Sequence, residues 1–234
     1  MGLFGLIKED FFTVKQNDPA LKSSLELFFN YPGLWALLFH RISHALYTRK
    51  VPYLPRLIAA FAQFLTVIDI HPGATIGRRV FIDHGTGVVI GETAVIEDDV
   101  LIYQQVTLGG VSLAKGKRHP TVKKGTVVGA GAKILGNITI GPYAKIGANS
   151  VVVKDVPENC TAVGVPARII AKGFDSSPLS HNKIPDITKE MINYLIRRIA
   201  VLEKALTTGD NTHILEQDNE LEEIYEAFIK SMES

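Results

Sequence analysis

The hydrophobic pattern changes twice along the chain, and the three patterns predict three kinds of structure. Up to about residue 68, apolar positions follow helical spacing, which predicts helices over Gly33–Tyr47 and Pro55–Val67. The dipeptide Asp18-Pro19 predicts a turn after a first short helix. We therefore expect a mixed α and β protein with a short helical region (1–68), a repeat region (69–172) and a helical tail (173–234).

In the repeat region an aliphatic residue recurs every six positions, often followed by glycine. The in-phase positions are Ile70, Ile76 and Ile82, then, after a gain of two residues, Ile90, Ile96, Ile102 and Leu108, and after a break Val122, Val128, Ile134, Ile140, Ile146 and Val152. A period of six matches short strands joined by tight turns, and neither a helix nor a single alternating strand. We expect the aliphatic side chains to point inward and to stack on their equivalents one coil away.

The break in the repeat is a polar, basic, glycine-rich segment. It covers residues 109–121 and contains the sequence KGKRHP. A segment that departs from a rigid repeat is expected to leave the coil as a loop, and loops on rigid scaffolds often carry function.

The tail returns to helical spacing. Its apolar residues form a heptad seam at Ile192, Leu195, Ile199, Leu202 and Leu206, followed by a second amphipathic segment with Leu221, Ile224, Tyr225 and Phe228. The seam predicts one of two arrangements, contact with another copy of the chain or packing on its own subunit, and its spacing does not distinguish them.

Composition excludes several classes of protein. Among the 234 residues, Lys and Arg number 25 against 24 for Asp and Glu, so the net charge of +1 gives no reason to expect a nucleic-acid partner. The apolar runs LWALLF and LIAAFAQFLTVI are shorter than the ~20 residues of a membrane span, and no signal peptide is visible. A single cysteine, Cys160, excludes an internal disulfide and suits a reducing compartment, so we expect a cytoplasmic protein.

Ionisable residues that could carry chemistry gather in two places. Asp69, His71, Asp83, His84 and Glu92 lie early in the repeat, and Arg118 and His119 lie in the break. The three histidines lack a recognisable metal-ligand spacing, so no metal is expected.

A histidine beside a carboxylate is the simplest base near neutral pH. Asp69 precedes His84 by slightly less than one coil, if three repeats make a coil of ~18 residues. The two residues would then lie on adjacent coils, close enough to meet around a corner. The alternative is that Asp69 caps a turn and that His84 is a solvated turn residue. Arg118 offers a fork for a carboxylate, or is simply a solvated loop residue.

Several segments together resemble the serine acetyltransferase family over about Asn17–Lys172. They are IDIHPGATIG, FIDHGTGVVIGETAVIEDDV, YQQVTLGG, KRHPTV and the run from VVGAGAKILG to VGVPARII. The combination of DIHP, DHGTG, GET and RHP separates this chain from sugar and antibiotic acetyltransferases with the same repeat. The resemblance implies a left-handed parallel β-helix, assembled as a homotrimer, that transfers acetyl from acetyl-CoA to L-serine for cysteine biosynthesis.

The resemblance also implies a role for each site residue. His84 would be the general base with Asp69 as its partner, and Asp18, Asp83, Arg118 and His119 would contact serine. The acetyl-CoA groove would include Gly110, Ala130 and Ala148. A backbone N–H near Gly109-Gly110 or the side chain of His119 would stabilise charge on the thioester oxygen. Transfer would be direct, because Cys160 lies outside both groups of residues.

The chain departs from the family pattern at both ends. It resembles the short form, which lacks the N-terminal helices that pair two trimers, so the tail seam is a candidate for that pairing. The chain ends Lys-Ser-Met-Glu-Ser and not in isoleucine, so docking to the sulfhydrylase partner is not carried over. Feedback inhibition by L-cysteine is usual in the family. The alternative functions are acetylation of homoserine or a sugar, and a regulatory scaffold for the sulfhydrylase.

Overall fold

The structure, a computed structural model, describes residues 2–18, 20–172, 192–200 and 202. Its first part is helical, with α1 (Leu3–Asn17), α2 (Glu26–Phe29), α3 (Pro32–Thr48) and α4 (Leu54–Thr66). Proline occupies the first turn of α3 and of α4, where a missing N–H costs nothing. The two helices expected from spacing agree with α3 and α4 to within one residue at each end.

Beyond α4 the chain forms a stack of very short strands. They are β1 (Asp69–Ile70), β2 (Thr75–Ile76), β3 (Phe81–Ile82), β4 (Val89–Ile90), β5 (Val95–Ile96), β6 (Leu101–Ile102), β7 (Thr107–Gly109), β8 (Thr121–Val122), β9 (Val127–Val128), β10 (Lys133–Leu135), β11 (Thr139–Ile140), β12 (Lys145–Ile146), β13 (Val151–Val152), β14 (Cys160–Gly164) and β15 (Ala167–Lys172).

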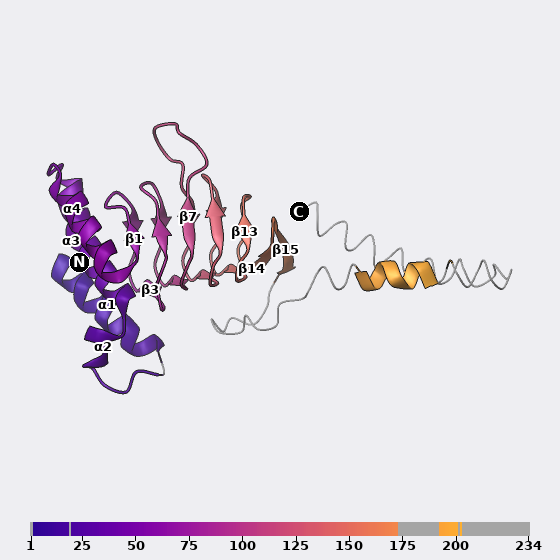
Figure 1. Ribbon diagram of the computed structural model, residues 1–234, viewed down its shortest axis with the longest axis horizontal. Coiled ribbons are helices and arrows are strands. Elements are labelled where there is room, and N and C mark those ends of the chain that lie inside the picture. Colours follow the sequence, from indigo (N-terminus) through magenta and orange to yellow (C-terminus); the bar gives the residue numbers. More distant parts are fainter. Residues whose placement is uncertain (1, 19, 173–191, 201, 203–234) are drawn as a thin grey trace.

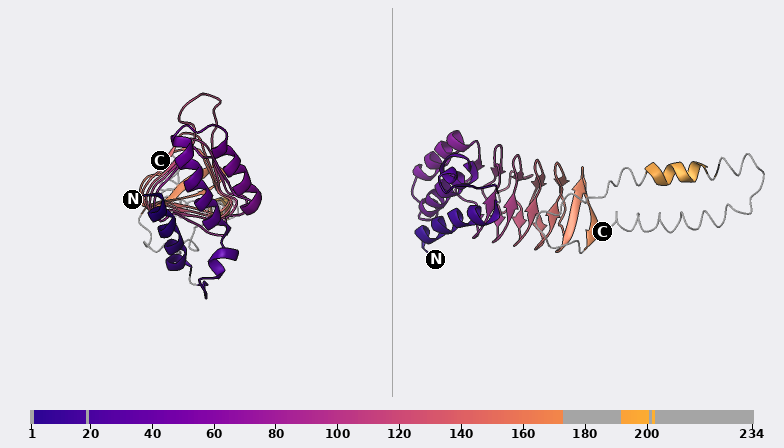
Figure 2. Two further views of the ribbon diagram at one scale, coloured as in Figure 1. Left: turned by 90° about the vertical axis from the view of Figure 1, so that its left-hand side faces the viewer. Right: turned by 90° about the horizontal axis from the view of Figure 1, so that it is seen from below.

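Every third strand pairs in parallel, so the chain builds three sheets. Sheet A contains β1, β4, β7, β10 and β13, sheet B contains β2, β5, β8 and β11, and sheet C contains β3, β6, β9, β12 and β14, with β15 antiparallel at its end. The result is the left-handed parallel β-helix that the resemblance implies. Figure 1 shows the coils stacked beside the helices, and the left view of Figure 2 looks along the stack from the helical end.

The aliphatic residues of the six-residue period form the core. All the in-phase positions predicted from the sequence are buried, none with more than 8% of its surface exposed. They stack in register: Ile70 pairs with Ile90, Ile90 with Leu108, and Leu108 with Ile134. Because each coil buries only a few side chains, the core is continuous only through this stacking.

The sheets meet at three corners, named here by the sheets they join. The C–A corner comprises 83–88, 103–106, 129–132 and 147–150; the A–B corner comprises 71–74, 91–94, 110–120 and 136–138; the B–C corner comprises 77–80, 97–100, 123–126 and 141–144. Along sheet A, Asp69 pairs with Val89, Val89 with Thr107, Thr107 with Lys133, and Lys133 with Val151. Each pair is separated by one coil, and the coils from Asp69 to Val89 and from Thr107 to Lys133 are longer than the other two. The added residues lie at the C–A corner 83–88 and in the loop 110–120, which projects from the stack in Figure 1.

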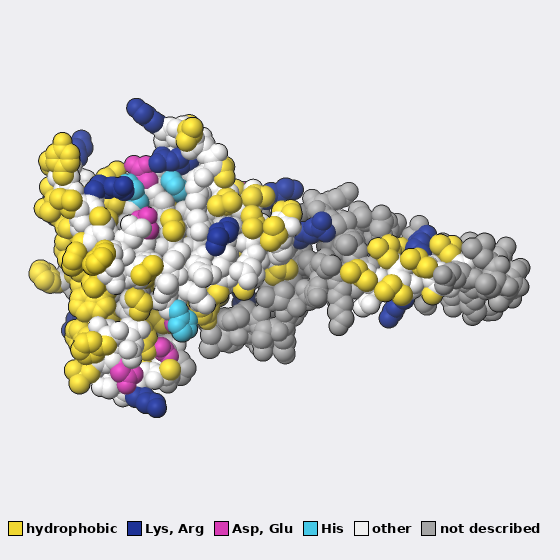
Figure 3. Space-filling model, viewed as in Figure 1, with side chains coloured by type: hydrophobic (Ala, Val, Ile, Leu, Met, Phe, Trp, Pro, Cys, Tyr) yellow, Lys and Arg dark blue, Asp and Glu magenta, His cyan; other side chains and the backbone are white. Residues whose placement is uncertain are grey.

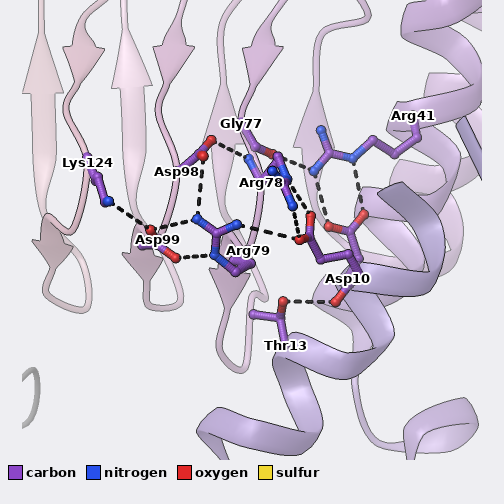
Figure 4. A network of polar contacts seen from close by, with 10 residues as sticks. Asp10, Thr13, Arg41, Gly77, Arg78, Arg79, Asp98, Asp99 and Lys124 are labelled. Atoms are coloured by element: carbon purple, nitrogen blue, oxygen red, sulfur yellow. Dashed lines mark hydrogen bonds and ion pairs between the residues drawn. The ribbon is translucent and has the colours of Figure 1, made fainter. Parts of the chain in front are cut away.

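Helix α1 is fastened to the β-helix by buried and half-buried charges (Figure 4). The Asp10 carboxylate accepts two hydrogen bonds of 3.1 Å from Arg41 on α3, and both side chains are almost fully buried. Arg41 also donates to the backbone carbonyls of Ile76 and Gly77. Arg78 donates two hydrogen bonds to Glu9. These contacts fix α1 against the first coil, and they therefore also fix Asp18, which follows α1.

The rest of the described chain bears on two further expectations. None of the described helices is both long and apolar enough to cross a membrane. Residues 192–200 are helical, and the seam residues Ile192, Leu195, Ile199 and Leu202 are each about half exposed, between 48% and 54%. Leu206 and the second amphipathic segment with Leu221, Ile224, Tyr225 and Phe228 lie outside the described residues.

Candidate active site

His84 projects from the C–A corner because that corner is enlarged. The segment 83–88 connects β3 to β4, and it is longer than the later turns of the same corner, such as 103–106. His84 takes a left-handed backbone conformation (φ +58°), and 73% of its side chain is exposed. Its Nε2 lies 3.9 Å from Asp83 Oδ1. An exposed imidazole at a rigid corner can reach a bound molecule without rearrangement of the coil.

Two carboxylates lie near one another at this corner, Asp83 beside His84 and Asp18 beside Asp83. Asp18, which follows α1, accepts a hydrogen bond of 2.7 Å from the Ala20 N–H and one of 2.5 Å from the Tyr31 hydroxyl. Burial raises the pKa of the Asp83 carboxyl, and the nearby Asp18 carboxylate raises it further, while His84 opposes the rise. Burial and the hydrogen bond to Asp18 likewise raise the pKa of Tyr31. The cluster carries more negative than positive charge, so it is suited to bind a cation.

Asp69 lies at the start of β1, half buried, and β1 pairs with the strand that follows the His84 corner. Within the described part of the chain, no hydrogen bond joins Asp69 to His84. Burial lowers the pKa of His71, and the charge of nearby Asp69 opposes this lowering. The proposed pair is thus near the same corner but not in direct contact.

A second polar cluster lies at the A–B corner. Arg118 Nη2 donates a hydrogen bond of 2.5 Å to Glu92 Oε2, and the Tyr47 hydroxyl donates one of 3.2 Å to Glu92 Oε1. The hydrogen bond from Arg118 lowers the pKa of the Glu92 carboxyl. Arg118 is therefore held in place by a carboxylate, and 27% of its side chain stays open to solvent. Its fork remains accessible to a further anion.

His119 is the most enclosed residue of this cluster, with only 8% exposed. A Cβ on Gly91 would lie 2.1 Å from Nε2 of the His119 ring, and one on Gly110 would lie 3.2 Å from it, so the ring occupies a notch that requires glycine at position 91. Burial lowers the pKa of His119, and the charges of Arg118 and Lys117 lower it further. Both effects favour the neutral form of the ring.

The residues expected to line a groove for acetyl-CoA do not all lie together. Ala130 and Ala148 are on the C–A corner, in register with Gln104 and His84 along the stack. Gln104 has a buried side-chain oxygen with no partner among the described residues. Gly110 lies on the A–B corner, beside Arg118 and His119.

The structure thus divides the predicted site residues between two corners. His84, Asp83 and Asp18 gather at C–A with Ala130 and Ala148 further along, and Arg118, His119 and Gly110 gather at A–B. Figure 3 shows histidine and acidic side chains in two separate places on one face, one of them beside the projecting loop. No group of histidine, cysteine and acidic residues suited to a metal occurs in the part of the chain that the structure describes.

Three residues to which the sequence assigned no role contact site residues: Tyr31, Glu92 and Thr93. For Glu92 and Thr93, the register of the sequence repeat could have indicated the contacts. Val95 pairs with Thr121, one coil later and beyond the projecting loop, and the same offset places Glu92 opposite Arg118 and Thr93 opposite His119. Nothing local in the sequence marks Tyr31 as the partner of Asp18.

Comparison with known proteins gives consistent matches. The family "Bacterial transferase hexapeptide (six repeats)" matches residues 119–154. A serine acetyltransferase from Synechococcus elongatus is 49% identical over 205 residues, which cover 87% of this chain and 84% of that protein. The serine acetyltransferase of Bacillus subtilis is also 49% identical over 205 residues, covering 87% and 94%.

Solved structures agree with these matches. A serine acetyltransferase in complex with cysteine superimposes with a TM-score of 0.74 at 42% identity, covering 78% of this chain and 72% of that one. The enzyme from Brucella abortus in complex with coenzyme A gives 0.69 at 43% identity, covering 72% and 68%. The soybean enzyme complexed with serine gives 0.69 at 44% identity, covering 72% and 69%.

Proposed function

The chain belongs to the serine acetyltransferase family, and from this premise we propose which of its residues carry out the reaction. It is an acyltransferase that moves the acetyl group of acetyl-CoA to the hydroxyl of L-serine, giving O-acetylserine and CoA. The observation that carries the assignment of residues is the exposed His84 beside the paired carboxylates Asp18 and Asp83.

In our proposal the two carboxylates bind the ammonium group of serine. Asp18 and Asp83 repel one another, and that repulsion is part of the reason why the pKa of Asp83 is raised. A bound ammonium group relieves the repulsion and gains two charge-assisted hydrogen bonds. Tyr31 holds Asp18 in position by the 2.5 Å hydrogen bond from its hydroxyl.

Arg118 binds the carboxylate of serine, and Glu92 holds the guanidinium in the orientation this requires. A sugar has no carboxylate for this fork and no ammonium group for the acidic pair. Homoserine has both groups, but its hydroxyl is one methylene further from them. The arrangement therefore favours serine over either alternative acceptor.

His84 acts as the general base. It removes the proton of the serine hydroxyl while the oxygen attacks the thioester carbonyl, a contribution typically worth ~10²–10⁴ in rate. The negative charge that develops on the carbonyl oxygen accepts a hydrogen bond from His119 Nε2–H. When the C–S bond breaks, the CoA sulfur leaves and takes its proton from the His84 imidazolium. Asp69, which lies at the same corner, is proposed to orient His84 through a hydrogen bond that forms when the substrates are bound.

The position of His84 and His119 on different corners supports a site shared by two chains. Each β-helix would place its C–A corner against one neighbouring chain and its A–B corner against another. Such head-to-tail contacts can close into a ring. We propose a homotrimer with three such sites. The groove for acetyl-CoA would follow the C–A corner past Gln104, Ala130 and Ala148, with Gly110 contributed by the neighbour.

Three further proposals concern inhibition, the pairing of trimers and location. L-Cysteine shares the ammonium and carboxylate groups of serine, so it can bind to the same residues. We propose that it inhibits by feedback. The half-exposed apolar seam on 192–202 supports pairing of two trimers through the tail. Cys160 is buried and unpaired, which suits the cytoplasm.

The proposed roles are tested by a steady-state assay with acetyl-CoA and serine, homoserine or a sugar. We expect serine to be the best substrate by kcat/KM and His84→Ala to lower kcat ~10²-fold or more. Thr86→Ala, at an exposed position of the same corner, is the matched control and should keep kcat. Activity of His84→Ala within about 3-fold of the wild type would remove His84 from the mechanism.

A further inference from the structure

Every polar group of Thr93 contacts the end of the projecting loop, residues 117–119. It lies on the A–B corner directly opposite His119 in the neighbouring coil. Its Oγ1 accepts hydrogen bonds from the backbone N–H groups of Arg118 (3.0 Å) and His119 (3.2 Å). Its carbonyl oxygen accepts one of 2.7 Å from Lys117 Nζ. One residue therefore fixes three consecutive residues of the loop.

Thr93 also contacts the imidazole of His119 twice. Its backbone N–H donates to Nδ1 at 3.2 Å, and its Oγ1 lies 2.9 Å from the same nitrogen. A hydroxyl has two acceptor positions and one hydrogen. Both acceptor positions of Oγ1 are taken by the backbone N–H groups, so its hydrogen is directed at Nδ1. Two donors facing Nδ1 leave no room for a hydrogen on that nitrogen.

The hydrogen of the neutral ring therefore resides on Nε2. Protonation of Nδ1 would set its N–H against the Thr93 N–H and would break both contacts. The charged groups around the ring are Lys117 and Arg118 on the loop and Glu92 on the corner, and the two cations outnumber the carboxylate. Nε2 has no hydrogen-bond partner among the described residues, so its N–H is free to donate to a ligand.

We propose that Thr93 is a positioning residue that locks His119 in the neutral Nε2–H form, so that His119 donates a hydrogen bond at the reaction centre but cannot act as a base. This proposal rests on the role of His119 in the proposed function. It separates the two histidines of the site: His84 is exposed and free to exchange a proton, whereas His119 is a fixed donor.

The test uses the full-length protein and three variants. Thr93→Val keeps the shape of the side chain but removes the hydroxyl, and Thr93→Ser keeps the hydroxyl but removes the methyl group. Thr126→Val is the matched control, because Thr126 is a buried corner threonine whose hydroxyl bonds to the backbone carbonyls of Lys123 and Gly141 at the B–C corner. For each protein, kcat and KM for serine are measured, and the histidine tautomers are identified by ¹⁵N NMR without substrate.

We expect the wild type to show the Nε2–H pattern for His119 at pH 7–8. Thr93→Val should show a mixture of tautomers and a kcat lowered about 10- to 100-fold, because the lost interaction acts on the developing charge. KM for serine should rise as well, because Oγ1 also holds the backbone N–H of Arg118. Thr93→Ser should restore both the tautomer and kcat to within about 3-fold, and Thr126→Val should leave both unchanged.

Each contrary result has a separate meaning. A wild-type His119 with its hydrogen on Nδ1, or an imidazolium at pH 7–8, overturns the proposal even if no variant folds. An unchanged tautomer in Thr93→Val overturns it whatever the activity. Equal losses in Thr93→Ser and Thr93→Val assign the effect to the methyl group and also overturn it. A changed tautomer with unchanged kcat overturns the donor role of His119, the part of the proposed function on which this inference rests.

Discussion

If the active site is shared between chains, two inactive variants should restore activity to one another. His84→Ala damages the C–A corner, and Arg118→Ala damages the A–B corner. The first removes the proposed base and should lower kcat/KM ~10²-fold or more, and the second removes the proposed charge-assisted hydrogen bond to serine, worth roughly 1.5–3 kcal/mol, or about 10- to 150-fold. Neither change touches the β-helix core, since both side chains lie outside it.

The expected recovery follows from the geometry of a closed ring. Each site takes its C–A corner from one chain and its A–B corner from the next. In a mixed trimer, with two chains of one variant and one of the other, only one of the three junctions joins an intact His84 to an intact Arg118. Purified mixed trimers should therefore have about a third of the wild-type kcat/KM, about 3-fold or more above Arg118→Ala and about 30-fold or more above His84→Ala.

The assay needs the two variants co-expressed with different affinity tags and purified over both, so that only mixed assemblies remain. Activity is measured at serine concentrations below KM, where both defects are visible. A control mixture of His84→Ala chains carrying the two tags should stay inactive. If the mixed assemblies are no more active than the better single variant, each chain holds a complete site and the shared-site reasoning is wrong.

Three other changes test the charges and the assembly. Asp83→Asn should stabilise the protein at pH 7–8 by about 0.5 kcal/mol and raise KM for serine, because it removes a carboxylate whose charge burial disfavours. Burial raises the pKa of Asp83 in the folded chain, so the wild type loses stability as pH rises from the ordinary pKa of aspartate to this higher value. The difference in thermal unfolding temperature between wild type and variant should therefore shrink as pH falls toward 4. Arg41→Met should lower the free energy of unfolding in urea by about 3–5 kcal/mol, because it leaves Asp10 buried without its partner, and the double variant with Asp10→Leu should recover much of the loss. Truncation after Lys172 should lower the subunit count measured by light scattering if the tail pairs trimers, and an unchanged count would show that it does not.

The repeat made much of the fold predictable from the sequence. A period of six with inward aliphatic residues determined which side chains are buried, and the structure confirms them from Ile70 to Val152. The period also indicated where the coil is interrupted, because two residues are gained before Ile90 and a longer break follows Leu108. These predictions succeeded because a β-helix is built from contacts between equivalent positions, which a sequence repeat records directly.

The site was less predictable because its contacts are not between equivalent positions. The distance between Asp69 and His84 was estimated for a coil of ~18 residues, but the first coil is longer than that, and its extra residues lie in the corner that carries His84. The contacts of Asp18 with Tyr31, and of Asp10 with Arg41, depend on how α1 and α3 pack, and no periodicity encodes that packing. Side chains at helix ends and in loops need the tertiary arrangement before they can be paired.

The two interruptions of the repeat explain why chemistry is possible on this scaffold. In a regular coil, each strand is bonded to the coils on either side and each corner is a tight turn, so no side chain projects far. Added residues push His84 out of the C–A corner, and the loop 110–120 carries Arg118 and His119 to the A–B corner. Corners tolerate such insertions because the strands before and after them keep their register, as Ile82 with Ile102 and Ile96 with Val122 do. Since the insertions lie on different corners, the proposed site needs groups from both, and in our proposal a second chain brings them together. On this reasoning assembly is itself a step in building the active site, and the position of the insertions determines which faces of the prism must meet.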